Sequence, residues 1–145
     1  MNTIKREEDG LYEQETISKI EMETILEKKL LICKYVAPVI SELEFMTFFH
    51  EVGGLVERYG IKKLIFDKRS LRVFHQPSME WYHVHWKKEM AKVGLKTYRK
   101  ILPEDKVFKM SVEIGRKKIR EKNPEFNFED FDIQYCESIE EAISK

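Results

Sequence analysis

IKKLIFDKRS, residues 61–70, is the stretch that decides the fold prediction. Its length and its apolar residues are typical of a short buried strand, and that strand ends at Asp67. A polar and aromatic loop follows, and QPSMEW, residues 76–81, begins a new helix near Pro77. In open α/β sheets, ligands and partners bind at the loops that leave the carboxyl ends of strands. The stretch therefore predicts an α/β fold and places its working edge at residues 67–78.

Strands and helices alternate along the rest of the chain. We predict a hairpin of strands over residues 17–24 and 30–36, helices over 41–59, 77–93 and 103–122, strands over 62–66, 97–102 and 130–136, and a short helix from Ser138. This ββαβαβαβα order predicts a mixed, largely parallel sheet of four to five strands, with helices packed mainly on one side. Residues 1–15 are polar and are expected to form a loose N-terminal arm or a weak extra element, and residues 16–145 a single domain.

The composition indicates a folded protein without a dominant charge. The 145 residues include 26 basic and 26 acidic side chains, so no overall field steers the chain toward nucleic acid or anionic lipid. No apolar run approaches the roughly 20 residues of a membrane span, and residues 1–10 lack the apolar core of a signal peptide. We therefore expect a cytoplasmic protein. Cys33 and Cys136 are expected to be buried, unpaired thiols, because no CxxC motif indicates zinc or redox chemistry.

One basic cluster lies at residues 116–122, at the end of a predicted helix. Its simplest interpretation is a solvated last turn whose positive charges complement the helix dipole. The alternative is a patch for RNA or lipid headgroups, which would need exposed aromatic side chains beside it. Phe126 and Phe128 lie close in sequence, but we expect them to pack the loop 123–131 onto the core.

The helix predicted over residues 77–93 carries both an apolar stripe and two histidines. On a helix His83 and His85 lie about 200° apart, so they cannot bind one metal ion, and no metal site is predicted. His83 is expected at the boundary of the core, bonded to backbone or water. The apolar stripe consists of Met79, Tyr82, Trp86, Met90 and Val93.

Trp81 is predicted to lie on the opposite face of that helix, about 140° from the centre of the stripe and together with His85 and Lys88. Exposed aromatic side chains are enriched at protein contacts. One interpretation is a partner-binding surface made by Trp81, His85, Lys88 and Phe74. The other is that Trp81 folds under the loop 68–76, against Phe74.

Three polar residues at the strand end are candidates for a ligand or regulatory site: Asp67, Ser70 and Ser78. Asp67 either contributes a carboxylate to such a site or bonds the loop amides of Arg69 or Ser70. Ser78 either caps the helix that follows or is a phosphorylation site, whose added charge the helix dipole and nearby basic residues would favour.

Three stretches resemble the SpoIIAA-like, or STAS/SEC14-like, group of small bacterial domains. They are Lys63–Leu71, the segment Ile101–Asp105 that leads into Met110–Glu113, and Ser138–Ala142. The resemblance implies a four- or five-stranded sheet with helices mainly on one side, and a regulatory or binding role without catalysis. Anti-anti-sigma members of the group carry a phosphorylatable serine in an Asp-Ser-Ser-Gly type turn. This chain lacks that turn, and Ser78 is its only comparable hydroxyl.

Two hypotheses for function follow from these patterns. The first is a regulatory or protein-interaction module that contacts a partner protein, or a second copy of itself, through loop 67–78 and the outer face of helix 77–93. It predicts no catalytic residue, no cofactor and no nucleic-acid partner. The second is a small-ligand-binding protein or enzyme that uses Asp67 with His75 or His85 at the carboxyl end of the strand. A weaker third option is nucleic-acid contact through residues 116–122.

Overall fold

One mixed sheet with helices on both faces makes up the fold. The computed structural model describes the backbone of residues 2–7, 10–17 and 19–145 and the side chains of residues 19–145. The strands are β1 (Asn2–Glu7), β2 (Gly10–Ile17), β3 (Ile20–Ile25), β4 (Leu30–Tyr35), β5 (Lys63–Asp67), β6 (Thr97–Ile101) and β7 (Asp132–Tyr135). The helices are α1 (Glu42–Tyr59), α2 (Gln76–Trp81), α3 (Lys87–Ala91), α4 (Lys106–Lys122) and α5 (Ile139–Ser144), with short turns η1 (Leu26–Lys28), η2 (Tyr82–Trp86) and η3 (Phe128–Asp130).

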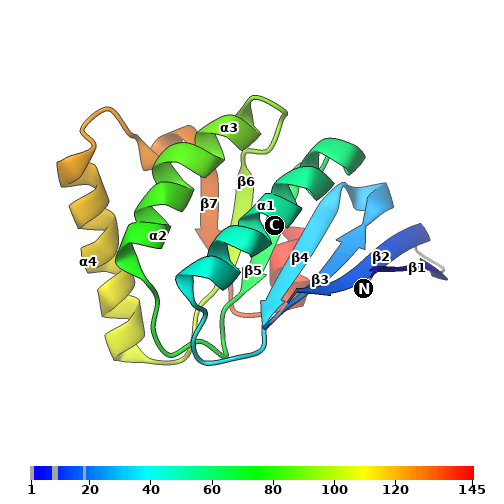
Figure 1. Ribbon diagram of the computed structural model, residues 1–145, viewed down its shortest axis with the longest axis horizontal. Coiled ribbons are helices and arrows are strands. Elements are labelled where there is room, and N and C mark those ends of the chain that lie inside the picture. Colours follow the sequence, from blue (N-terminus) through cyan, green and yellow to red (C-terminus); the bar gives the residue numbers. More distant parts are fainter. Residues whose placement is uncertain (1, 8–9, 18) are drawn as a thin grey trace.

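The sheet grows in one direction, because its strands are ordered β1 to β7 as in the chain. Neighbours from β1 to β4 pair antiparallel, and neighbours from β4 to β7 pair parallel. Since crossovers between parallel strands are right-handed, a sheet that grows one way has its crossover helices on one face. Figure 1 shows α1, α2, α3 and α4 on that face and the C-terminal helix on the other.

The predicted α/β fold, with helices mainly on one side, is confirmed. The five strands β3 to β7 correspond to the predicted ones, and they are largely parallel. The sheet has two strands more than predicted, because β1 and β2 extend it through the segment that we expected to be an arm or a weak extra element. None of the helices in the described residues combines the length and apolarity that a membrane crossing needs.

Alternation along the strands divides the core between the two faces. Leu64 and Phe66 of β5 belong to the larger cluster, which lies under α1 to α4. Ile65 belongs to the smaller cluster, which packs against α5. Cys33 and Cys136 are buried free thiols, as predicted.

The helix predicted over residues 77–93 runs without a break from Gln76 to Ala91, but it contains a π-helical turn. In that turn the amide of Lys87 donates to the carbonyl of Tyr82. The extra residue rotates the first half of the helix by about 100° relative to a regular helix. The ring of Trp81 therefore lies 6.3 Å from the rings of both Phe45 and Phe49 of α1. This corrects the predicted outward orientation of Trp81, which is half-buried.

Candidate functional site

A narrow pocket lies at the carboxyl ends of β4 to β7, between the sheet, helix α2–η2 and α4. Tyr35, Lys100 and Tyr135 of β4, β6 and β7, and Lys68 directly after β5, contribute to its lining. Its walls are mostly apolar, and water-sized molecules can occupy about 50 Å³ of it. Such a space accepts a group of a few heavy atoms, since a drug-sized ligand needs roughly 300 Å³ or more. The apolar lining includes Phe45, Leu71, Phe74, Met79, Leu102 and Phe108.

Basic side chains gather in and behind this pocket. Lys68, Lys100 and His83 line it, and each is less than a tenth exposed. Lys87 is fully buried, with its ammonium group 4.5 Å from the ring of Tyr98 and 4.9 Å from that of Tyr82. Since an ammonium group interacts favourably with the face of an aromatic ring, the rings replace part of the lost hydration.

These basic groups have no acidic partner among the side chains that the structure describes. Among residues 19–145, no aspartate or glutamate lines the pocket. Lys87 Nζ and His83 Nδ1 are buried without a hydrogen-bond partner in the same part of the chain. Lys100 Nζ lies 5.1 Å from the ring of Tyr82, and Lys68 Nζ lies 5.6 Å from that of Phe66. Aromatic faces therefore surround the cations where carboxylates are usually found.

Strand alternation explains why two lysines point into the pocket. Lys68 follows Leu64 and Phe66 at intervals of two residues, so it faces the helices as they do. Lys100 follows Tyr98 in the same way, and it pairs in register with Phe66. A lysine two residues after a buried aromatic residue is the sequence signal that could have identified Lys68 and Lys100 as pocket residues. Lys87 carries no comparable signal, because the π-helical turn directs it inward.

Burial lowers the pKa of each of these basic groups. It brings the pKa of Lys68 from 10.5 to about 8. For Lys100 and Lys87, burial is the largest cause, and neighbouring positive charges lower the pKa further. Burial followed by the charge of Lys87 also holds the pKa of His83 well below 6.5. At pH 7 the imidazole is therefore neutral, and an anion in the pocket would neutralise positive charge that no acidic side chain of the described lining compensates.

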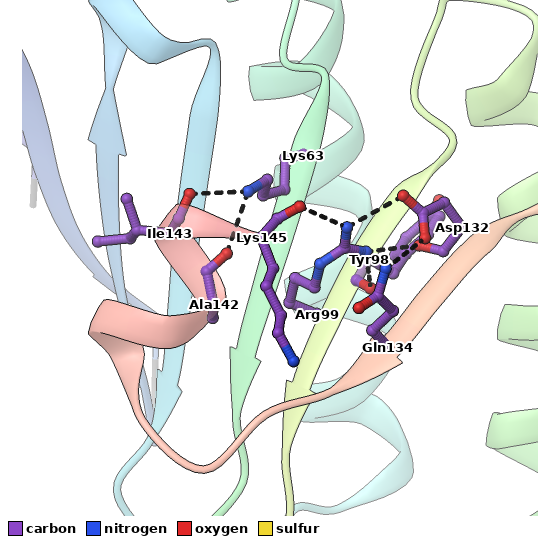
Figure 2. Close-up of polar contacts among 8 residues, drawn as sticks. All are labelled: Lys63, Tyr98, Arg99, Asp132, Gln134, Ala142, Ile143 and Lys145. Carbon is purple, nitrogen blue, oxygen red and sulfur yellow. Dashed lines mark hydrogen bonds and ion pairs between the residues drawn. The ribbon is translucent and has the colours of Figure 1, made fainter.

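Cations on the other face of the sheet contrast with this cluster, because they are paired (Figure 2). Lys63 Nζ donates to the carbonyl oxygens of Ala142 and Ile143 at 3.0 and 2.9 Å, at the end of α5. Arg99 donates to the carboxylate of Asp132 at 3.0 Å and to the backbone oxygen of Lys145 at 2.8 Å. Positive side chains at the C-terminal end of a helix also complement its dipole. Lys63 and Arg99 therefore hold α5 against the sheet.

The predicted ligand residue Asp67 lies outside the pocket. It is buried, and it accepts hydrogen bonds from the Arg69 guanidinium at 2.9 and 2.7 Å and from the Arg69 amide at 3.2 Å. The predicted bond to a loop amide is thus confirmed. Asp67 follows Phe66 and precedes Lys68, so alternation directs it to the face of α5. The structure pairs it with Arg69 rather than with a histidine, and His75 bonds Ser78 instead.

Ser78 is not the N-cap that we predicted. The helix begins at Gln76 with His75 in the cap position, and Ser78 is buried in the first turn. Its hydroxyl lies 2.7 Å from His75 Nδ1. A buried, hydrogen-bonded hydroxyl is not presented to a kinase without local unfolding. Ser70 is half-buried in the loop after β5, outside the pocket lining.

The four residues of the predicted partner surface do not share one exposed patch. His85 and Lys88 are exposed on the helix, as predicted. Trp81 is half-buried against α1, and Phe74 is half-buried with its ring 5.5 Å from that of Phe108 on α4. His83, predicted at the boundary of the core, is instead fully enclosed, with its ring 5.0 Å from that of Phe128.

The basic cluster at residues 116–122 is divided between solvent and the pocket. Lys117, Lys118 and Lys122 are exposed, which agrees with a solvated last turn. Arg116 lines the pocket, donates to the Tyr135 hydroxyl at 3.0 Å and lies over the ring of Phe128 at 4.2 Å. Phe128 is buried, as predicted for the loop 123–131.

Comparisons with known proteins add no assignment. No family model matches the chain, and neither a curated protein nor a solved structure matches it significantly. Among residues 19–145, no group of three or more histidine, cysteine or acidic side chains is arranged to hold a metal ion. Evidence about function therefore comes from the size of the pocket, its apolar walls and its buried basic groups.

Proposed function

We propose that the chain binds a small organic anion in the pocket at the carboxyl ends of β4 to β7. The observation that carries the proposal is the group of buried lysines, Lys68, Lys87 and Lys100, without acidic partners among the described residues. This is the ligand-binding hypothesis from the sequence, with lysines in place of Asp67.

Energetics support an anionic ligand. An unpaired ammonium group in a protein interior costs several kcal/mol, and a buried charge is usually retained only with a partner. The fold provides such partners for Lys63 and Arg99 on its other face. A bound carboxylate or phosphate would provide them for Lys68 and Lys100. Binding of the anion would then offset the free-energy cost of burying these ammonium groups.

The shape of the pocket limits the ligand. The centres of water-sized molecules can reach about 50 Å³ of the pocket, which limits the ligand to a few heavy atoms, such as a carboxylate or phosphate group with a short carbon body. The apolar walls made by Phe45, Phe74 and Phe108 favour a body without charges of its own.

Calorimetric titration with lactate and with inorganic phosphate tests the proposal. We expect wild type to bind at least one of them with a dissociation constant of about 1 mM or lower, and the Lys68→Met/Lys100→Met double variant to bind neither. Lys92→Met is a matched control, because Lys92 is exposed, pairs with Glu89 and does not line the pocket. Equal heats from wild type and the double variant, or no binding by wild type, would contradict the proposal.

Docking of a protein partner or a second copy on helix 76–91 stays a separate prediction. It now depends on exposed His85 and Lys88, since Trp81 and Phe74 pack within the chain. His85→Ala/Lys88→Ala should weaken capture of such a partner, or self-association in sedimentation, while leaving lactate binding unchanged. Unchanged capture and self-association would remove the interaction hypothesis.

A further inference from the structure

Lys100 has the surroundings of a reactive amine. It is 4 % exposed and lines the pocket, and its nitrogen lies 5.1 Å from the Tyr82 ring. Burial, and then the charges of Lys87, Lys68 and Arg116, lower its pKa well below 10.5. A lysine that is desolvated beside other cations carries more of the neutral amine at pH 7, and the neutral amine is the nucleophile.

Other groups in the pocket complement a substrate with a carbonyl and a carboxylate. Lys68 and Arg116 line the same pocket as Lys100, and Arg116 Nε is buried without a hydrogen-bond partner in the described chain. Both side chains carry a positive charge and donate hydrogen bonds, so both can bind a carboxylate. His83 adds a neutral imidazole whose Nδ1 has no partner in the same residues.

We propose that the amine of Lys100 condenses with the carbonyl group of a small 2-oxo acid whose carboxylate is held by Lys68 and Arg116. This inference rests on the proposed function, since it assigns a ligand class and a covalent step to the same pocket. The small free volume favours an acid of the size of pyruvate over larger ones.

The step balances without a further reactant. The nitrogen lone pair forms a bond to the carbonyl carbon, and the carbonyl π electrons move to the oxygen. Both protons of the amine leave with that oxygen as water, and the nitrogen and carbon are left joined as an imine. His83 can accept a proton from the nitrogen and return it to the departing hydroxyl, which is the role of a neutral imidazole in general acid–base catalysis.

Reductive trapping tests the covalent step. Wild type is incubated with pyruvate and sodium cyanoborohydride, which reduces an imine to a stable secondary amine. Intact-mass and peptide analysis should show one pyruvate adduct, located on Lys100. The adduct should persist in Lys92→Met and fall at least tenfold in Lys100→Met. An adduct spread over exposed lysines, or retained in Lys100→Met, would overturn the inference.

Lactate separates this inference from the proposed function, because it has the size and charge of pyruvate but no carbonyl group. Lactate binding without pyruvate trapping would leave the proposed function intact and reject the imine. Failure of both lactate and phosphate to bind would reject the proposed function as well. His83→Asn should slow trapping by about 100-fold, a larger change than any in its affinity for lactate. An unchanged trapping rate would remove His83 from the step.

Discussion

Replacing Lys68 by methionine should stabilise the fold at neutral pH. Methionine keeps most of the length of the buried stem and removes the charge. Burial lowers the pKa of Lys68 from 10.5 to about 8. Since each pKa unit corresponds to about 1.4 kcal/mol, the folded state carries this positive charge at a cost of about 3 kcal/mol. We therefore expect Lys68→Met to raise the free energy of unfolding at pH 7 by up to about 3 kcal/mol.

The gain should depend on pH in a defined direction. Below pH 8, Lys68 is protonated in both the folded and the unfolded chain, so its full cost is present. Between pH 8 and 10.5 the unfolded chain binds more protons than the folded one, so the stability of wild type rises with pH. The advantage of Lys68→Met should therefore fall to about 1 kcal/mol at pH 10.

Urea unfolding of wild type and variant at pH 7 and pH 10, without added anion, measures both effects. Lys92→Met is the control, because its side chain is 63 % exposed, and it should change stability by less than about 0.5 kcal/mol at either pH. A loss of stability in Lys68→Met at pH 7, or an equal gain at both pH values, would refute the reasoning. Either result would show that Lys68 is not an unpaired buried charge.

Three further changes test the surrounding structure. Burial alone would raise the pKa of Asp67, but Arg69 outweighs it and the net pKa is lowered, so Asp67→Asn should lose roughly 1–3 kcal/mol at pH 7. Because that stability is present above pH 3.8 and is lost as pH falls through the lowered pKa, wild type and variant should converge in acid denaturation. Trp81→Ala should cost roughly 2–4 kcal/mol in urea unfolding, because it opens a cavity against α1. Lys63→Met removes both bonds to the end of α5, and hydrogen exchange in that helix should accelerate by roughly tenfold.

Local chemistry explains which parts of the fold could be predicted. The Ser-x-x-Glu pattern of Ser41 and Glu44 is the sequence signature of a capping box, and it forms one: the Glu44 amide donates to the serine hydroxyl and the Ser41 amide to the Glu44 carboxylate. Of the predicted apolar stripe, Tyr82, Trp86 and Met90 are buried as their helical spacing predicts, whereas Val93 lies beyond the end of the helix and is exposed. These features depend on residues three or four positions apart, which are neighbours on a helix surface, so a short stretch of sequence is enough to predict them.

The candidate site could not be predicted in the same way. In the sequence, Asp67 stands out as a candidate because it ends an apolar run. In the structure, the guanidinium group of Arg69, two positions on, donates two hydrogen bonds to that carboxylate. A regular helix would turn His83 to the boundary of the core, as the sequence predicts. The π-helical turn and the cover provided by Phe128 bury it instead.

The sequence by itself determined the order of strands and helices from β3 onward, the cap at Ser41 and the faces on which strand residues lie, because these follow from periodicity and from contacts between near neighbours. Only the tertiary structure decided that Lys68, Lys100 and His83 meet in one pocket without a carboxylate. The physical reason is that their meeting depends on the register between β5 and β6 and on the rotation of helix 76–91 against the sheet. Both are set by the packing of the whole core, which no short stretch of the chain specifies.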